Sequence, residues 1–207
     1  MSNDRLSLAI AAIDLANRQD PNLESWQGQA IPKELLYSHR MTEWLARLDP
    51  SPSEARQLAA RAQHIRRWMI PREDYPSGRE AYLRWRTTLY RFHADQVEAI
   101  LRDAGYDSQT VALVRKMVGK QGIKRDPDVQ LLEDVACLVF LDYYFPAFAA
   151  TKDQEKLIDI VRKTWNKMSE HARNAALFLH LPDELAAVVA LALNPAEKNT
   201  DGNPNST

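Results

Sequence analysis

The sequence predicts an all-α protein that folds as a single-domain helical bundle. Three observations favour this fold class. Apolar residues recur at three- and four-residue spacing through most of the 207 residues. Residues that start and stop helices bracket these segments, and no segment shows the sustained alternation of a strand. A chain of this length is expected to build one core, so residues 1–193 are predicted to form one domain.

The first part of the chain is predicted to form three helices. The stretches "LSLAIAAIDLA" (6–16) and "ELLYSHRMTEWLARL" (34–48) repeat apolar residues with the helical period. The third stretch, 51–70, stops at Pro71, because the residue before a proline is pushed out of helical geometry. This prediction places His64 in the last turns of the third helix.

The longest helix is predicted for residues 77–105. Ser77 with Glu80 three positions later has the spacing of a capping box, and Gly105 is typical of a residue that ends a helix.

The next helix, predicted for 126–145, is expected to be central and the most buried. Asp126 is a cap with Pro127 at the first helical position, and the middle of the segment is apolar on nearly every face. Residues 194–207 offer little that can be buried and are predicted to be a disordered tail. Further helices are expected at 153–168, 170–179 and 182–192.

Composition narrows the class of protein. The chain has 27 Lys plus Arg against 28 Asp plus Glu, so its net charge does not indicate a nucleic-acid or membrane partner. No run reaches the roughly 18 apolar residues of a membrane span, and a cytoplasmic location is expected. Cys137 is the single cysteine, which excludes an intramolecular disulfide and indicates a small buried core residue.

Four polar residues stand on helices that otherwise form core. Glu133 and Asp134 begin the most apolar helix, where a carboxylate is costly to bury unless it is paired or bound to a metal. With His64 and His93 they are the ligand types of a divalent transition-metal site in a helical bundle. The alternative is structural, with Asp134 paired to an arginine and each histidine a satisfied core residue.

Arginine is concentrated between residues 61 and 91, which hold eight of the 18 arginines and no lysine. The planar guanidinium binds phosphate or carboxylate with two hydrogen bonds and stacks on aromatic rings. The pattern predicts an anion pocket, although a solvated helix surface is the alternative. The residues predicted to bind the anion are Arg66, Arg67, Arg72, Arg86 and Arg91, and those predicted to line the pocket are Tyr37, Trp68 and Trp85.

Four stretches together resemble a known family. "YSHRMTEWLARL", "RQLAARAQHIRRWMIPREDYP", "YLRWRTTLYRFHADQ" and "LEDVACLVFLDYYF" are similar to the bacterial and fungal family of unknown function called DUF4202, over residues 5–192. Its members are sometimes labelled glutamyl-tRNA synthetase. The chain lacks the His-Ile-Gly-His motif of that enzyme class, and "KMSEH" at 167–171 is only a weak match to the class's other motif. The resemblance implies no activity.

A more remote resemblance concerns the order of four elements. "YSHRM", "RAQHI", "FHA" and "EDV" are arranged as in the HD superfamily of metal-dependent phosphohydrolases. This resemblance implies an HD-like bundle in which His64, His93 and Asp134 hold one divalent transition metal ion and Glu133 acts as general base. The chain departs from the superfamily at two positions. Tyr37 replaces the first ligand, and Ile65 replaces the aspartate expected after His64.

Two hypotheses of different classes follow. The first is an HD-like metal-dependent hydrolase of a small phosphorylated or nucleotide-like compound. The second is a degenerate HD-fold protein that binds an anionic metabolite, peptide or RNA through the arginine-rich pocket without catalysis. A structural or interaction protein, whose arginines only hold the fold, is a third possibility. In the first two, a small anionic molecule is the expected partner.

Overall fold

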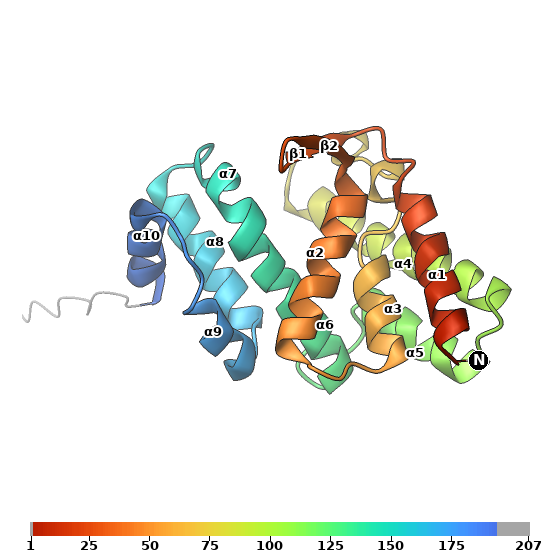
Figure 1. Cartoon of the computed structure of the whole chain (residues 1–207). Helices are drawn as coiled ribbons and strands as arrows, with labels where there is room; N and C mark the ends of the chain where they lie inside the picture. Colours follow the sequence, from red (N-terminus) through yellow and green to blue (C-terminus); the bar gives the residue numbers. More distant parts are fainter. Residues whose placement is uncertain (1, 194–207) are drawn as a thin grey trace, which may run out of the picture.

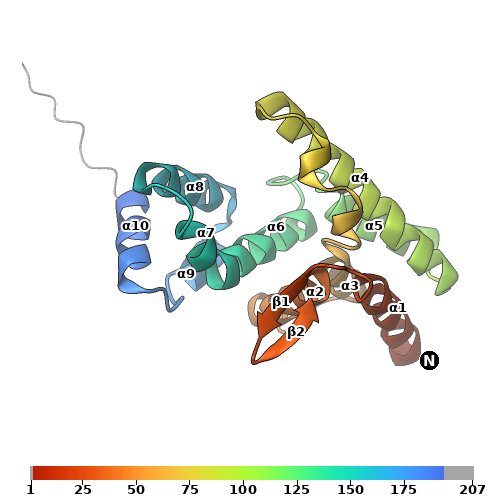
Figure 2. The ribbon, with the colours of Figure 1, turned by 90° about the horizontal axis from the view of Figure 1, so that it is seen from above.

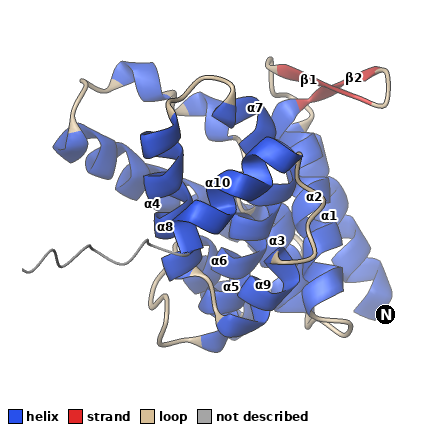
Figure 3. Cartoon of the chain, turned by 90° about the vertical axis from the view of Figure 1, so that its left-hand side faces the viewer, coloured by secondary structure: helices blue, strands red, loops and turns tan. Residues whose placement is uncertain are grey.

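The computed structural model describes residues 2–193, and the predicted tail at 194–207 lies outside the described residues. Helices are the main elements of this part of the chain, together with one short hairpin (Figures 1 and 3). The prediction of an all-α protein is confirmed.

The chain begins with helix α1 (Ser2–Asn17), followed by a hairpin that was not predicted. Strands β1 (Leu23–Trp26) and β2 (Gln29–Pro32) pair antiparallel, with Trp26 opposite Gln29. The two-residue turn has positive φ at Gln27 (50°) and Gly28 (77°), as hairpin turns of this length require. Four-residue strands are too short to show sustained alternation, and Gln-Gly is not the usual turn signal.

Helices α2 (Lys33–Leu48) and α3 (Glu54–Ala62) follow. The predicted helix through residue 70 is wrong, because α3 ends eight residues earlier. Arg66 adopts a left-handed conformation (φ 52°), and its N–H donates to Asn17 Oδ1 at 3.0 Å. The next turns are the short helices η1 (Arg67–Met69) and η2 (Arg72–Asp74). His64 therefore lies in a turn after α3, not in the last turns of a helix.

Tertiary hydrogen bonds explain this break. In a continuous helix the Arg66 N–H and the Ile65 carbonyl would bond within the helix. Here the first bonds to α1, and the second lies 2.8 Å from Nδ1 of His93. Partners distant in sequence thus replace the local hydrogen bonds that a helix continuing to residue 70 would have formed.

Helix α4 (Arg79–Asp103) is the longest, as predicted, but its capping box is wrong. The N-cap is Gly78, and no side chain caps this end. The C-terminal prediction is confirmed: Gly105 has φ 77°, and the Tyr106 N–H donates to the Leu101 carbonyl at 3.0 Å, which is a Schellman ending.

Helix α5 (Ser108–Val118) is absent from the predicted helices. The sequence does contain a pattern typical of this helix. Asp107 caps it by accepting from the Thr110 N–H, and valines at 111, 114 and 118 repeat at helical spacing. β-branched valines have lower helix propensity, which weakens the pattern.

Helix α6 (Pro127–Val139) lies in the middle of the molecule (Figure 2). It packs against α2, α3, α5, and two later helices, α8 (Gln154–Lys167) and α9 (Glu170–Ala176). Asp126 caps it as predicted, accepting from the Asp128 and Val129 N–H groups. The prediction of a central, most buried helix agrees with this packing. A π-helical turn, η3 (Phe140–Tyr144), then leads into α7 (Phe145–Ala149).

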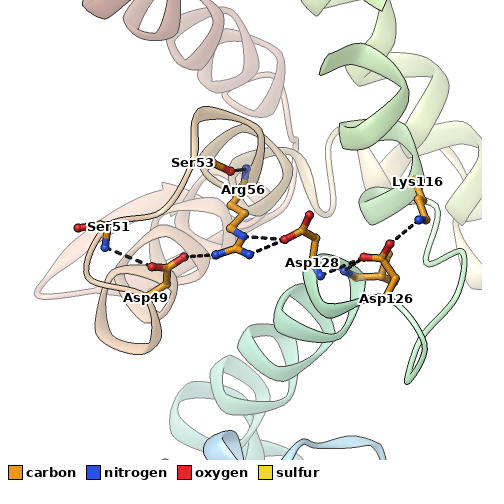
Figure 4. A network of polar contacts seen from close by, with 8 residues as sticks. Asp49, Ser51, Ser53, Arg56, Lys116, Asp126 and Asp128 are labelled. Carbon is orange, nitrogen blue, oxygen red and sulfur yellow. Dashed lines mark hydrogen bonds and ion pairs between the residues drawn. The ribbon is translucent and has the colours of Figure 1, made fainter. Parts of the chain in front are cut away.

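Arg56 of α3 ties the beginning of α6 to the rest of the bundle (Figure 4). It binds Asp49 at the end of α2 (2.7 Å) and Asp128 in the first turn of α6 (2.6 Å). Lys116 of α5 pairs with the cap Asp126. Three helices thereby fix where α6 starts.

The C-terminal helices are α8, α9 and α10 (Asp183–Leu193), close to their predicted positions. Asp134 of α6 fastens α9. Its Oδ1 accepts from the Ser169 N–H (2.8 Å) and from Gln130 (2.8 Å), and its Oδ2 accepts from the Ser169 hydroxyl (2.5 Å). Ser169 in turn caps α9 through the Ala172 N–H.

Replacing Asp134 by asparagine is expected to lower the free energy of unfolding by about 2 kcal/mol, because an amide leaves one of these buried donors without an acceptor. Urea unfolding measures the change. Asp159→Asn, on an exposed ion pair with Lys163, is the control and is expected to cost less than about 0.5 kcal/mol. Equal stability of the two variants would contradict this role for Asp134.

Candidate functional site

A cavity of about 500 Å³ lies between α2, α4, α6 and α8. Helix α4 forms one wall with side chains spaced by three or four residues, which places them on one helix face. These α4 residues are Tyr82, Trp85, Arg86, Leu89 and Tyr90.

The other walls come from segments far apart in the sequence. Lys33, Glu34 and Tyr37 lie at the start of α2, while His64 and Arg67 come from the turns after α3. The remaining wall is shared by the segment after α5 and by α6, η3 and α8. Its residues include Lys120, Glu133, Ala136, Phe140, Thr164 and Lys167.

Part of the cavity wall is basic. Glu133 is 4% exposed, forms an ion pair with Lys120, and lies 3.6 Å from Nζ of Lys167. Arg86 contacts the Tyr90 hydroxyl, and its guanidinium lies over the Tyr90 ring. Arg86, Lys120, Glu133 and Lys167 are called the basic cluster below. Its formal charge is three cations against one carboxylate.

Glu133 is ionised within this cluster. Burial raises the pKa of its carboxyl, but the charge and hydrogen bond of Lys120, with Lys167 and Arg86, outweigh burial and bring the pKa below its ordinary value. A carboxylate held in this way is a structural counter-charge and a poor proton acceptor.

Another part of the cavity wall contains His64. Its ring stacks on Tyr37 with centroids 4.0 Å apart and planes 12° apart. Nδ1 lies 3.5 Å from Glu34 Oε2, and Nε2 lies 3.5 Å from Nη1 of Arg67. A guanidinium only donates, so Nε2 is assigned as the acceptor and Nδ1–H points to Glu34. Arg67 also lies over Trp85, 5.0 Å from the ring centroid.

Burial governs the protonation of this pair. It raises the pKa of Glu34 to about 7, against the opposing charge of Arg67. It lowers the pKa of His64 well below 6.5, and Arg67 adds to this effect. The imidazole is therefore neutral, and the contact between His64 and Glu34 is not a permanent ion pair.

The predicted metal ligands are only partly brought together. His93 lies beside His64, with ring centroids 5.8 Å apart, and is fixed through Nδ1 by the Ile65 carbonyl. Burial lowers the pKa of His93 to about 3. Asp134 does not line the cavity, because Ser169 and Gln130 take its oxygens.

The donor set does not fit the divalent ion that the HD resemblance implies. Across residues 2–193 no group of three or more His, Cys, Asp or Glu side chains is arranged to hold a metal. The predicted ligands also face positive charges. Nε2 of His64 lies beside the Arg67 guanidinium, and Glu133 is paired with Lys120 and Lys167. Cations already occupy the directions from which a metal ion would be bound.

The predicted anion-binding residues divide into two groups. Arg67 and Arg86 line the cavity, as do Tyr37 and Trp85. The others do not. Arg66 donates to Gln96, Arg72 to the carbonyls of Tyr75 and Pro76, Arg91 is exposed, and Trp68 is half-buried outside the wall.

Sequence reasoning missed the lysines and Glu34. Lys33, Lys120 and Lys167 lie on three distant segments, outside the arginine-rich region. No local pattern connects them, because their convergence depends on how α2, α5 and α8 pack.

One family model matches the chain, described as "Domain of unknown function (DUF4202)", over residues 7–189. This match confirms the resemblance carried by the four stretches. No curated protein and no solved structure matches. The HD resemblance stays a prediction. Within the described residues, no helix is long and apolar enough to cross a membrane.

Glu34 predicts a dependence of stability on pH. Its folded pKa of about 7 exceeds the ordinary 4.5, so the folded state holds this proton more tightly. The resulting stabilisation is complete below pH 4.5 and is lost as pH rises through 7, by about 3 kcal/mol at most. Glu34→Gln cannot titrate. The unfolding free energy of wild type relative to this variant should therefore fall from pH 5 to pH 8.

Taking this difference cancels the titration of His64 and His93, which both proteins contain. The exposed change Glu73→Gln is the control and should show no such trend. A difference between wild type and Glu34→Gln that stays constant from pH 5 to 8 would contradict the raised pKa.

Proposed function

We propose that this chain, which belongs to the DUF4202 family, binds a small anionic molecule in the cavity between α2, α4, α6 and α8. One observation carries the proposal: Lys120 and Lys167 both pair with the single carboxylate of Glu133, and Arg86 lines the same cavity as a third cation. The proposal follows the second of the two hypotheses from the sequence.

Charge balance supports an anionic ligand. Cations in a partly enclosed cavity repel one another more strongly than in open water, because screening is weaker there. Glu133 offsets one of the three charges, and no carboxylate of the described residues forms an ion pair with Arg86. An anion beside the basic cluster would supply the missing counter-charge, with Arg86 offering a planar pair of donors.

The dimensions of the cavity support a small molecule. A volume of about 500 Å³ suits a metabolite rather than a folded partner or an RNA segment. Leu89, Ala136 and Phe140 provide apolar wall beside the basic cluster. The ligand class is therefore an anionic group attached to a small, partly apolar body.

Arg86→Gln tests this binding site. The charge at the cluster falls by one, so affinity for an anion is expected to drop roughly 10- to 100-fold. Inorganic phosphate, pyrophosphate, citrate and nucleoside monophosphates are the probes, first by thermal shift and then by calorimetry. Arg91→Gln, an exposed arginine on the same helix, is the matched control.

We expect the wild type to bind at least one probe, Arg86→Gln to lose this binding, and Arg91→Gln to keep it. Equal affinity of both variants would place the anion elsewhere.

A second candidate function, hydrolysis of the bound anion, is favoured by one observation. His64 stands in the cavity wall as a neutral imidazole, with Glu34 beside Nδ1 and Arg67 beside Nε2. For this step Arg67 would turn from Nε2 to the bound anion, and Nε2 would then accept a proton from a water molecule as the water oxygen bonds to the ester centre. The imidazolium would then return that proton to the departing alkoxide. Glu34 would orient the ring, and Arg67 would offset the developing negative charge.

His64→Gln separates hydrolysis from binding. Loss of a general base is expected to slow turnover about 100-fold or more while the affinity set by the basic cluster stays within about twofold. Release of phosphate or alcohol from phosphate and carboxylate esters is measured, with His171→Gln, outside the cavity, as control. Probes that bind without turnover would leave binding as the function. Turnover that persists in His64→Gln would exclude this base.

A further inference from the structure

The outer face of α1 is apolar although it covers nothing. Ala9, Ile13 and Ala16 on the inner face are buried, and the helix packs against α2, α3 and α4. On the opposite face Leu8 and Leu15 are each 62% exposed. Figures 1 and 2 show α1 at the edge of the bundle.

Five exposed residues of this face form one straight seam. Their spacing is four, three, four and three, which at 3.6 residues per turn confines them to an arc of about 80°. Such a seam is the contact pattern of paired helices, whereas scattered surface leucines follow no line. The seam residues, all exposed, are Asp4, Leu8, Ala11, Leu15 and Arg18.

The residues at the two ends of the seam carry opposite charges, and their side chains are not paired with any described residue. The side chains of Asp4 and Arg18 form no hydrogen bond or ion pair with any described residue, whereas the side chains of their neighbours Arg5 and Asp14 are paired with Glu54 and Arg61. Arg18 continues the helical bonding through its N–H to the Asp14 carbonyl at 2.8 Å, so its position on the face is fixed.

We propose that the outer face of α1 pairs antiparallel with the same face of a second copy of this chain. A twofold axis near Ala11 places Asp4 beside Arg18 of the second copy at both ends, and Leu8 against its Leu15. The small Ala11 side chains meet at the centre and allow close approach. Parallel pairing would instead bring like charges together at both ends.

Stabilisation of the helix dipole explains only part of this pattern. An aspartate in the first turn and an arginine after the last turn also stabilise a lone helix. That effect gives no reason for two exposed leucines in line between the charges. Self-complementarity under a twofold axis accounts for all five residues, as symmetric dimers require.

The association is weak. One helix face buries less than the roughly 1,200 Å² of a standard interface, so dissociation constants on the order of 10 to 100 μM are expected. The dimer does not depend on the proposed ligand, because α1 contributes no residue to the cavity wall.

Charge reversal tests the proposal by sedimentation equilibrium from about 10 to 500 μM. Wild type is expected to dimerise. Asp4→Arg alone and Arg18→Asp alone should each weaken dimerisation at least about tenfold, because both ends become repulsive. An equimolar mixture of the two variants should form heterodimers, and the doubly reversed variant should dimerise as wild type does.

Leu8→Ser is expected to abolish dimerisation, while Leu191→Ser, at a 48% exposed leucine of α10, should leave it unchanged. Circular dichroism verifies the fold of every variant. Monomeric wild type throughout the concentration range, or single reversals that leave dimerisation unaltered, would overturn the proposal.

Discussion

Two adjacent buried carboxylates on the central helix organise most of this molecule. Glu133 and Asp134 are 4% and 3% exposed, and a charged group so buried must be paired. Neighbours in sequence point about 100° apart on a helix, so each meets different elements. Glu133 forms ion pairs with Lys120 and Lys167 and is the single carboxylate of the basic cluster. Asp134 caps α9 through Ser169 and fastens the C-terminal helices.

The turn after α3 determines which side chains reach the cavity. Its left-handed residue, Arg66, interrupts the helical path, and the Arg66 side chain donates to Gln96 while Arg67 and His64 lie in the cavity wall. A continuous helix would keep the consecutive arginines about 100° apart along one straight axis. The hydrogen bonds of the turn with Asn17 and His93 therefore do more than terminate α3, since they place the Arg67 guanidinium beside both Trp85 and His64.

The features that were predicted correctly are those that depend on residues close together in the sequence. The central helix, its Asp126 cap and the ending at Gly105 depend on residues a few positions apart, and these predictions agree with the structure. The need of Glu133 and Asp134 for partners was also visible in the sequence. Their identity was not, because lysines and a serine from distant segments supply the partners in place of a metal or an arginine. The end of α3 was missed for the same reason, since Asn17 lies 49 residues away.

The last turn of α1 connects the two surfaces on which the proposals rest. Asn17 accepts the N–H of Arg66 and so holds the turn that carries Arg67 and His64. Arg18, the next residue, is the basic end of the α1 seam. Neighbours in sequence point about 100° apart on a helix, so a change of the Arg18 side chain alters the outer face of α1 and leaves the contact between Asn17 and Arg66 in place. Pairing of the copies and binding of the anion are therefore separable by variants, although both depend on the same turn of α1.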